Sequence, residues 1–125
     1  MSYRIPDDSF HVDIHGSIPT IRFEANMSST HFHVQVNTSA GWQMVVDDVG
    51  LGRKVPIQGG PIRSVSDFAG KRFFWDITLA DFAGSSRVEA VLDIFIEQDG
   101  NTLLHKHDVH FITGQESYYE FLDAI

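Results

Sequence analysis

The segment SRVEAVLDIFIEQDGNTLLHKHDVHFIT, residues 86–113, decides the fold class because it has the pattern of a single β-hairpin. Apolar and polar residues alternate on both sides of Asp99-Gly100, which is the period of a strand with one buried face. Asp-Gly is also a preferred pair for a two-residue type I′ turn. We therefore predict two antiparallel strands that meet at this turn.

The turn predicts which residues of the hairpin lie opposite one another. A regular two-residue turn places His105 beside Ile94 and Lys106 beside Asp93. Apolar residues then pair with apolar residues, and opposite charges meet. A slip of one residue would instead place Lys106 and Asp108 with the apolar set, so we predict the regular register.

This register divides the three histidines of LHKHDVHF, residues 104–111. His105 and His107 share the inward, apolar face, whereas His110 lies on the outward face opposite Glu89. The inward imidazoles have three interpretations. They are neutral core residues bonded to polar neighbours, or they line a pocket that binds a small ligand, or they bind a metal ion together with ligands from another strand.

The same alternation recurs along most of the chain. Five further segments have it: 9–15, 20–25, 30–38, 41–47 and 71–80. In 41–47, Trp42, Met44 and Val46 share the apolar face, which predicts that they pack in the core. Seven or eight short strands with turn residues between them predict an all-β fold, an antiparallel β-sandwich of the immunoglobulin-like or jelly-roll kind. A small closed barrel is the alternative. The length of the chain predicts a single domain over residues 1–125.

The C-terminal end of the chain changes period. Tyr118, Phe121, Leu122 and Ile125 fall at i, i+3, i+4 and i+7, which is the spacing of one helical face. We predict a short C-terminal helix. It would have to dock onto the strands, because an isolated helix of this length is unstable.

Composition excludes several classes of function. A net charge of −8 repels a phosphate backbone, so we expect no nucleic acid partner. The chain has no cysteine, which excludes thiol catalysis and favours an intracellular protein. No apolar run approaches the roughly 18 residues of a membrane span, and the N-terminus lacks a signal-peptide pattern. We expect a cytoplasmic protein without a membrane partner.

Positive charge gathers in one stretch of the chain. Five of the nine basic residues lie within residues 53–72: Arg53, Lys54, Arg63, Lys71 and Arg72. Much of this stretch belongs to a long connection over residues 47–67, and connections of this length are commonly functional. Arg53, Lys54 and Arg63 are candidates for binding an anionic ligand. Charge balance against an acidic neighbour or a second subunit is the alternative.

A second histidine pair has the spacing of metal ligands. His31 and His33 lie on one face of a predicted strand, about 7 Å apart. Together with His105 and His107 they are candidate ligands of a zinc ion. Pairs of aspartates at strand ends could bind calcium through loop oxygens. The sequence indicates no other cofactor.

Large apolar residues occur on faces that are otherwise polar. They are Phe74, Val91, Phe95 and Leu104. They predict an apolar patch on the far face of a sheet, and such patches are commonly covered. Either the C-terminal helix covers the patch through Tyr118 and Phe121, or a second subunit does.

Three functional hypotheses follow. The chain carries no catalytic motif, which favours a non-enzymatic binding or assembly module that self-associates through an apolar sheet face, as a homo-oligomer or with another protein. The alternative is a small-ligand or metal-binding pocket around His105 and His107, in which catalysis could occur. The third is a carbohydrate-binding module, which is suggested by the architecture alone.

Overall fold

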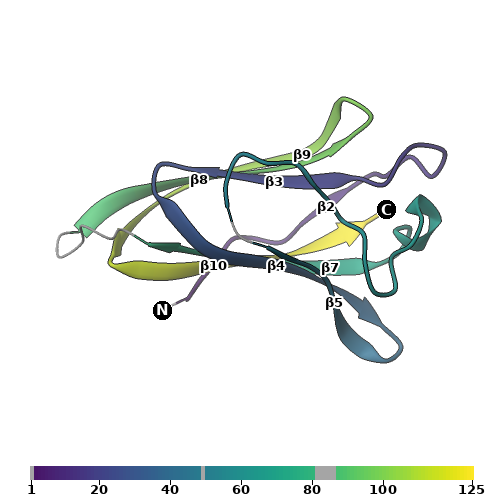
Figure 1. The fold of residues 1–125 in the computed structure, drawn as a ribbon, viewed down its shortest axis with the longest axis horizontal. Coiled ribbons are helices and arrows are strands. Elements are labelled where there is room, and N and C mark those ends of the chain that lie inside the picture. The colour runs from purple at the N-terminus through teal and green to yellow at the C-terminus, as the bar shows by residue number, and fades with distance from the viewer. Residues whose placement is uncertain (1, 49, 81–86) are drawn as a thin grey trace.

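A computed structural model shows a chain of nearly all β-strands, arranged in two packed layers (Figure 1). It describes residues 2–48, 50–80 and 87–125. Sheet A contains β1 (Ser2–Arg4), β2 (Asp8–Phe10), β4 (Ser28–Thr38), β5 (Gly41–Asp48), β7 (Arg72–Ala80) and β10 (Gln115–Ala124). Sheet B contains β3 (Thr20–Ala25), β6 (Val55–Pro56), β8 (Arg87–Gln98) and β9 (Asn101–Thr113).

The strand order brings β9 of sheet B and β10 of sheet A next to each other along one side of the molecule. In sheet A the antiparallel strands run β5–β4–β7–β10, and β1 and β2 lie parallel to β10. Sheet B runs β6–β3–β8–β9, so β9 is an edge strand.

The prediction of an all-β chain is confirmed. Within the described residues the one helical element is a 3₁₀ turn at Val65–Asp67, and no helix is long and apolar enough to cross a membrane.

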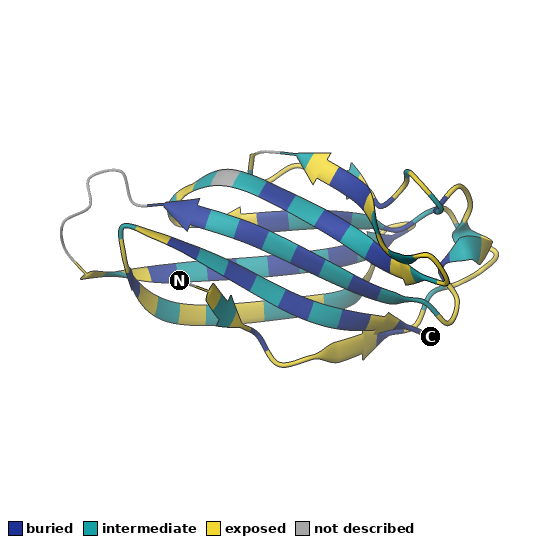
Figure 2. Ribbon diagram, turned by 90° about the horizontal axis from the view of Figure 1, so that it is seen from below, coloured by how far each residue is buried: buried dark blue, intermediate teal, exposed yellow. Residues whose placement is uncertain are grey.

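The core lies between the layers, because buried and less buried residues alternate along the long strands (Figure 2). At its centre the rings of Trp75 from sheet A and Phe23 from sheet B lie 5.4 Å apart. Phe23 also contacts Phe32 of sheet A at 4.8 Å. Ile77 and Ile94 are fully buried beside them. Burial of these large apolar side chains is the main stabilising contribution to the two-layer fold.

The hairpin turn between β8 and β9 is the one that the sequence predicted. Asp99 and Gly100 have φ angles of 50° and 81°. A positive φ at both central residues is what a type I′ turn requires. Gln98 pairs with Asn101 across the turn.

Beyond the turn the register departs from the prediction. Glu97 pairs with Thr102, but the next pair is Ile96 with Leu104, so Leu103 is the extra residue of a β-bulge. Both leucines are half-buried and pack against the core. A regular strand would have turned one of them away from the core, so the bulge adds buried apolar surface.

The bulge turns every later residue of β9 to the opposite face. His105 pairs with Phe95 and His107 with Asp93, and both imidazoles point outward. The predicted inward position of His105 and His107 is therefore wrong. The inward residues are instead Lys106, Asp108 and His110.

The C-terminal helix is also a wrong prediction. Residues Gln115–Ala124 form β10, which pairs with β7 along nearly its whole length. The residues of β10 that point inward include Glu116, Tyr118 and Glu120. Two buried glutamates break the apolar alternation that identifies a strand from its sequence.

A second bulge lies where β4 pairs with β5. The pair Val34–Val46 is followed by the pair Gln35–Met44, so Val45 is the extra residue. As in β9, the bulge reverses the faces of the residues on one side of it. The alternation in the sequence had placed the whole of β5 in a single register.

This second bulge leaves two large side chains on the outside. Trp42 and Met44 are 41% and 46% exposed, although the alternation predicted them in the core. The connection after β5 packs on the bulge through two glycines. A Cβ atom at Gly59 would lie 2.4 Å from the carbonyl oxygen of Val45, and one at Gly60 would lie 2.8 Å from that of Met44. Only glycine permits such a close approach.

Candidate functional site

Polar side chains from β9 and β10 face each other between the two layers. They are Lys106, Asp108 and His110 from β9, and Glu116, Tyr118 and Glu120 from β10, and we call these six residues the polar stripe. Tyr118 and Glu120 are fully buried and Glu116 nearly so. Buried polar groups need partners inside the protein, and the N-terminal segment supplies several of them.

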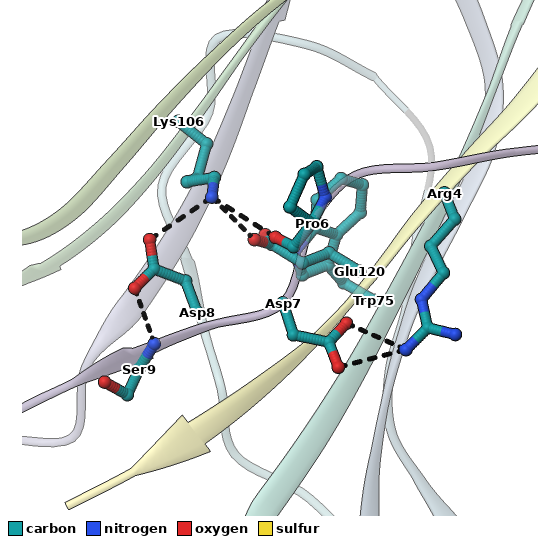
Figure 3. A network of polar contacts seen from close by, with 8 residues as sticks. All are labelled: Arg4, Pro6, Asp7, Asp8, Ser9, Trp75, Lys106 and Glu120. Carbon is teal, nitrogen blue, oxygen red and sulfur yellow. Dashed lines mark hydrogen bonds and ion pairs between the residues drawn. The ribbon is translucent and has the colours of Figure 1, made fainter.

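One end of the stripe is an ion pair between the half-buried Lys106 and the fully buried Glu120 (Figure 3). The Lys106 Nζ lies 3.2 Å from the Glu120 carboxylate and 3.2 Å from the Asp8 carboxylate, and it donates to the carbonyl of Pro6 at 3.3 Å. The indole Nε1 of Trp75 donates to Glu120 at 3.0 Å. Burial raises the pKa of Glu120 to about 7, although Lys106 favours its charged form.

The other end of the stripe is covered by an aromatic ring. Tyr3 stacks on the imidazole of His110 at 4.2 Å and meets the ring of Tyr118 edge-on at 5.7 Å. The Nε2 atom of His110 lies 4.0 Å from the carboxylate of Glu116. Burial raises the pKa of the Tyr118 hydroxyl and also that of Asp108.

A buried carboxyl with a raised pKa is a common mark of acid–base catalysis. Glu120 does not fit that role in this arrangement. Its side chain is fully buried, and its oxygens face Lys106 and Trp75. A substrate has no access to it.

The outer face of sheet A carries a cluster of six large side chains, four of which are aromatic. We call its members the aromatic surface: Gln35, Trp42, Met44, Phe74, Tyr119 and Phe121. A shallow hollow of about 210 Å³ lies among four of them, lined by Gln35, Trp42, Phe74 and Phe121. The ring of Trp42 lies 6.2 Å from that of Phe74 and 5.8 Å from that of Phe121.

Two arginines border the aromatic surface at one end. The guanidinium groups of Arg4 and Arg72 lie 5.0 Å and 5.2 Å from the ring centre of Phe121. Asp7 holds both, accepting from Arg4 at 3.0 Å and from Arg72 at 2.8 Å. Burial opposes ionisation of Asp7, but the two arginines hold its pKa below the ordinary value.

Imidazoles and carboxylates border the opposite end. His33 lies opposite Asp76 on β7 and Asp47 on β5, and His31 contacts Asp47. The ring of His33 is 5.8 Å from that of Phe74, so this polar group adjoins the aromatic surface. Burial raises the pKa of Asp76, and the nearby imidazoles of His33 and His31 offset part of this increase.

The predicted ligand-binding pair lies on the other side of the molecule. His105 Nε2 and His107 Nδ1 lie 2.8 Å and 2.9 Å from the same oxygen of Asp93. His105 also stacks on Phe95 at 4.2 Å, on the exposed outer face of sheet B. Burial would raise the pKa of Asp93, but the two imidazoles hold it below the ordinary value. The structure thus shows a surface His–Asp–His cluster in place of an inward pocket.

The four candidate metal ligands do not come together. His31 and His33 lie on the outer face of sheet A, and His105 and His107 lie on the outer face of sheet B. In residues 2–48, 50–80 and 87–125, no group of three or more His, Cys, Asp or Glu side chains is arranged to hold a metal ion.

The basic candidates are also separate from one another. Arg53 contacts Asp48, and Lys54 lies 3.8 Å from Glu97. Arg63 donates its backbone amide to Asp67. The first two contacts match the charge-balance interpretation of the basic stretch, and the three side chains do not converge on one point.

The predicted apolar patch is divided among three places. Phe74 and Phe121 belong to the aromatic surface of sheet A, and Val91 and Phe95 lie on the outer face of sheet B. Leu104 and Tyr118 point inward. Three of the four predicted patch residues thus lie on an outer face, but not on the same one, and Leu104 points inward.

Sequence reasoning missed Trp42 and the Lys106–Glu120 pair. Trp42 was assigned to the core because a bulge gives no signal in an alternating pattern. The pair was missed because the faces of β9 were assigned wrongly and because the segment that contains Glu120 was predicted to be a helix. The stretch ESYYE, residues 116–120, does alternate if glutamate is allowed to point inward.

Comparison with known proteins identifies no relative. No protein-family model matches the chain, and no curated protein or solved structure is significantly similar to it. The function must therefore be argued from the geometry of the chain itself.

Proposed function

We propose that this protein is a non-enzymatic binding module that self-associates through the aromatic surface of sheet A. Its fold would be a β-sandwich in the broad class that includes immunoglobulin-like and jelly-roll domains. The observation that carries the proposal is the exposure of Trp42 and Met44 beside a hollow lined by aromatic rings. Exposed apolar clusters of this kind typically mark interaction sites.

The composition of the aromatic surface is that of a protein interface. Trp, Tyr, Phe, Met and Arg are the residue types enriched in the buried centres of interfaces. Trp42, Met44, Phe74 and Tyr119 supply the apolar centre, and Arg72 lies at its border. Charged residues stand around this centre rather than within it, as in a typical interface rim.

The geometry favours a protein partner over a sugar. The ring planes of Trp42 and Phe121 are inclined by 55°, and those of Phe74 and Trp42 by 65°, so they form no flat platform. A small-ligand site has several convergent polar groups that orient the ligand. Gln35 is the one polar residue that lines the hollow.

The charges that border the aromatic surface favour a second copy as the partner. Along β7, Arg72 lies on one side of Phe74 and Asp76 on the other, and all three point outward. A two-fold axis in the interface, crossing β7 at Phe74, would place Arg72 of each copy opposite Asp76 of the other. Two-fold interfaces are the commonest in homo-oligomers. The pairing would offset the repulsion between two chains of charge −8.

Sedimentation of Trp42→Ala across a range of concentrations tests the proposal. We expect the natural chain to form dimers as concentration rises and the variant to remain monomeric. Phe111→Ala is the matched control, because Phe111 is an aromatic residue 49% exposed on the outer face of sheet B. The control should dimerise like the natural chain. A natural chain that stays monomeric at several hundred micromolar would refute self-association, and glycan binding lost in Trp42→Ala would instead assign this face to carbohydrate.

A charge exchange tests the orientation of the interface. Arg72→Glu and Asp76→Lys should each weaken dimerisation, because each places like charges opposite one another. A mixture of the two variants should form heterodimers in which one of the two contacts has its charges exchanged and remains attractive. Failure of the mixture to associate more strongly than either variant alone would exclude this axis.

A further inference from the structure

The N-terminal segment, residues 2–10, holds the polar stripe closed and also borders the aromatic surface. On the inside, Asp8 and the carbonyl of Pro6 bind Lys106, and Tyr3 covers His110. On the outside, Arg4 lies over Phe121. Figure 3 shows the contacts of Pro6 and Asp8 with Lys106, and the pairing of Arg4 with Asp7 in the same short stretch of chain.

The segment is an addition to the edge of sheet A rather than a part of its interior. Its two strands are three residues each, and both pair with β10 alone. It is anchored by two buried side chains, Ile5 and Phe10, and by the amide of Ile5, which donates to the carbonyl of Tyr119 at 2.9 Å. Terminal segments of this kind open locally more often than a whole domain unfolds.

We propose that residues 2–10 form a pH-dependent latch. The latch closes firmly when the Glu120 side chain is protonated, and it loosens when Glu120 ionises. The contact that makes the latch responsive is the sharing of the Lys106 ammonium between Glu120 and Asp8. The inference does not depend on self-association, because it concerns the chain by itself.

The groups around Glu120 determine the direction of the effect. They are Lys106 and Asp108 from β9, Asp8 from β2, Trp75 from β7 and Tyr118 from β10 itself. The inward residues of β8 nearest to this level, Leu92 and Ile94, are apolar. Among these groups of the described residues, Lys106 is the one cation, and Asp8 is the one that belongs to the latch.

Opening the latch changes the environment of Glu120 in two ways. Solvent reaches the carboxyl, and the negative charge of Asp8 moves away. Burial and Asp8 both raise the pKa of Glu120 in the closed state. Its pKa must therefore fall when the latch opens, while Lys106 and Trp75 stay in place. Linkage then requires that a rising pH favours the open state.

Amide hydrogen exchange at Ile5, followed by NMR, measures the opening directly. Its protection factor, corrected for the intrinsic rate at each pH, should fall between pH 5.5 and pH 8.5. The fall should be about tenfold for each unit by which opening lowers the pKa of Glu120. The amide of Ile94, in the centre of sheet B, reports global unfolding. Ile5 should exchange faster than Ile94 at every pH, which shows that its exchange reports opening of the latch and not unfolding of the whole chain. The measurement should be made at a protein concentration at which sedimentation shows a single species, so that association does not affect the exchange rates.

Two variants at matched positions decide the cause. Glu120→Gln should abolish the pH dependence of Ile5 protection. Glu116→Gln should retain it, because Glu116 lies on the same face of β10 but near His110, away from Asp8. A natural chain without the pH dependence, or a Glu120→Gln variant that keeps it, would overturn the latch.

A third variant covers the case in which Glu120→Gln fails to fold. Asp8→Asn removes one partner of Lys106 at an exposed position on the three-residue strand β2, outside the core of the sheets. Protection of Ile5 should fall at pH 5.5, and its remaining pH dependence should be smaller than in the natural chain. Unchanged protection at pH 5.5 would show that Asp8 does not hold the segment, and the proposal would be wrong.

Discussion

At the scale of the residue, the Lys106–Glu120 pair shows how this chain buries charge. Glu120 is fully buried, and it is tolerated because Trp75 donates a hydrogen bond to it and Lys106 forms an ion pair with it. Such a pair costs desolvation and recovers the cost only when its geometry is good. The pKa of Glu120 differs between the folded and unfolded chain, so the free energy of unfolding depends on pH.

Stability should decrease as the pH rises from about 5 to about 8. The folded chain holds the proton of Glu120 up to a pKa of about 7, against an ordinary value of 4.5. Its contribution is complete below the ordinary pKa and is lost as pH rises through the folded pKa, a loss of at most about 3 kcal/mol. Urea denaturation at several pH values measures it.

The Glu120→Gln variant provides the control for this pH dependence. Its free energy of unfolding should decrease less between pH 5 and pH 8 than that of the natural chain. The raised pKa values of Asp76 and Asp108 leave a smaller decrease in the same direction. Asp8 and Asp93 have lowered pKa values, so they act in the opposite direction, but only as the pH falls below their ordinary value near 3.8. A natural chain that is more stable at pH 8 than at pH 5 would contradict the role given to Glu120.

Removing the cation should cost more than removing the pair. Lys106→Met leaves Glu120 buried without its counter-ion, and we expect a loss of about 3 kcal/mol at pH 8. The loss should be smaller at pH 5, where Glu120 is neutral. The double variant Lys106→Met/Glu120→Met should recover much of the stability. Thermal unfolding of the three chains at both pH values is the measurement, and equal losses for the single and double variants would argue against a coupled pair.

At the scale of the element, two bulges decide what the strands present. The extra residue Leu103 turns His105 and His107 outward and Lys106 inward. The extra residue Val45 turns Trp42 outward. A bulge shifts the face of every residue on one side of it, so a single insertion changes half a strand.

The bulge at Val45 should depend on Gly59. Gly59→Ala places a Cβ against the Val45 carbonyl oxygen at a position where φ is 147°. We expect a loss of about 2 kcal/mol, since neither backbone can move without breaking strand pairing. The control is Gly52→Ala in the same connection, where φ is 79° but no atom lies within 4 Å, so only the backbone preference is lost. Chemical denaturation of both variants tests the difference, and equal losses would mean that the close contact is unimportant.

At the scale of the whole molecule, the two outer faces have separate chemistry. Sheet A carries the aromatic surface, and sheet B carries the His–Asp–His cluster with the Phe95–His105 stack. The N-terminal segment touches the first of these faces and the polar stripe between the sheets. A change at the buried ion pair can thus reach the rim of the proposed interface.

Tryptophan fluorescence should report the proposed association. Trp75 is buried at 1% exposure, so quenching by acrylamide reports mainly on Trp42. Dilution of the natural chain through the dimer–monomer transition should increase quenching as Trp42 becomes accessible. The Trp42→Phe variant, which keeps Trp75 alone, should show little quenching at every concentration. Quenching that does not change with concentration would place Trp42 outside any interface.

The sequence by itself determined the properties that depend on near neighbours. Six long segments were identified as strands because alternation is a local signal, and the Asp99–Gly100 turn was identified because only a few residue pairs accept its positive φ angles. The segment 9–15 was read as one strand, but only β2, Asp8–Phe10, is there. The all-β class followed from these local signals.

Only the tertiary structure decided which face each polar residue occupies. Neither Lys106 on β9 nor Glu120 on β10 is expected to point inward when its own strand is considered alone. A charge is tolerated inside a protein only when it is paired, and here each residue is the partner of the other. Because the hydrophobic pattern was applied to each strand separately, it predicted the wrong register for β9 and a helix in place of β10. The two errors have one physical cause: the two strands bury their polar residues against each other, and that pairing exists only in the folded chain.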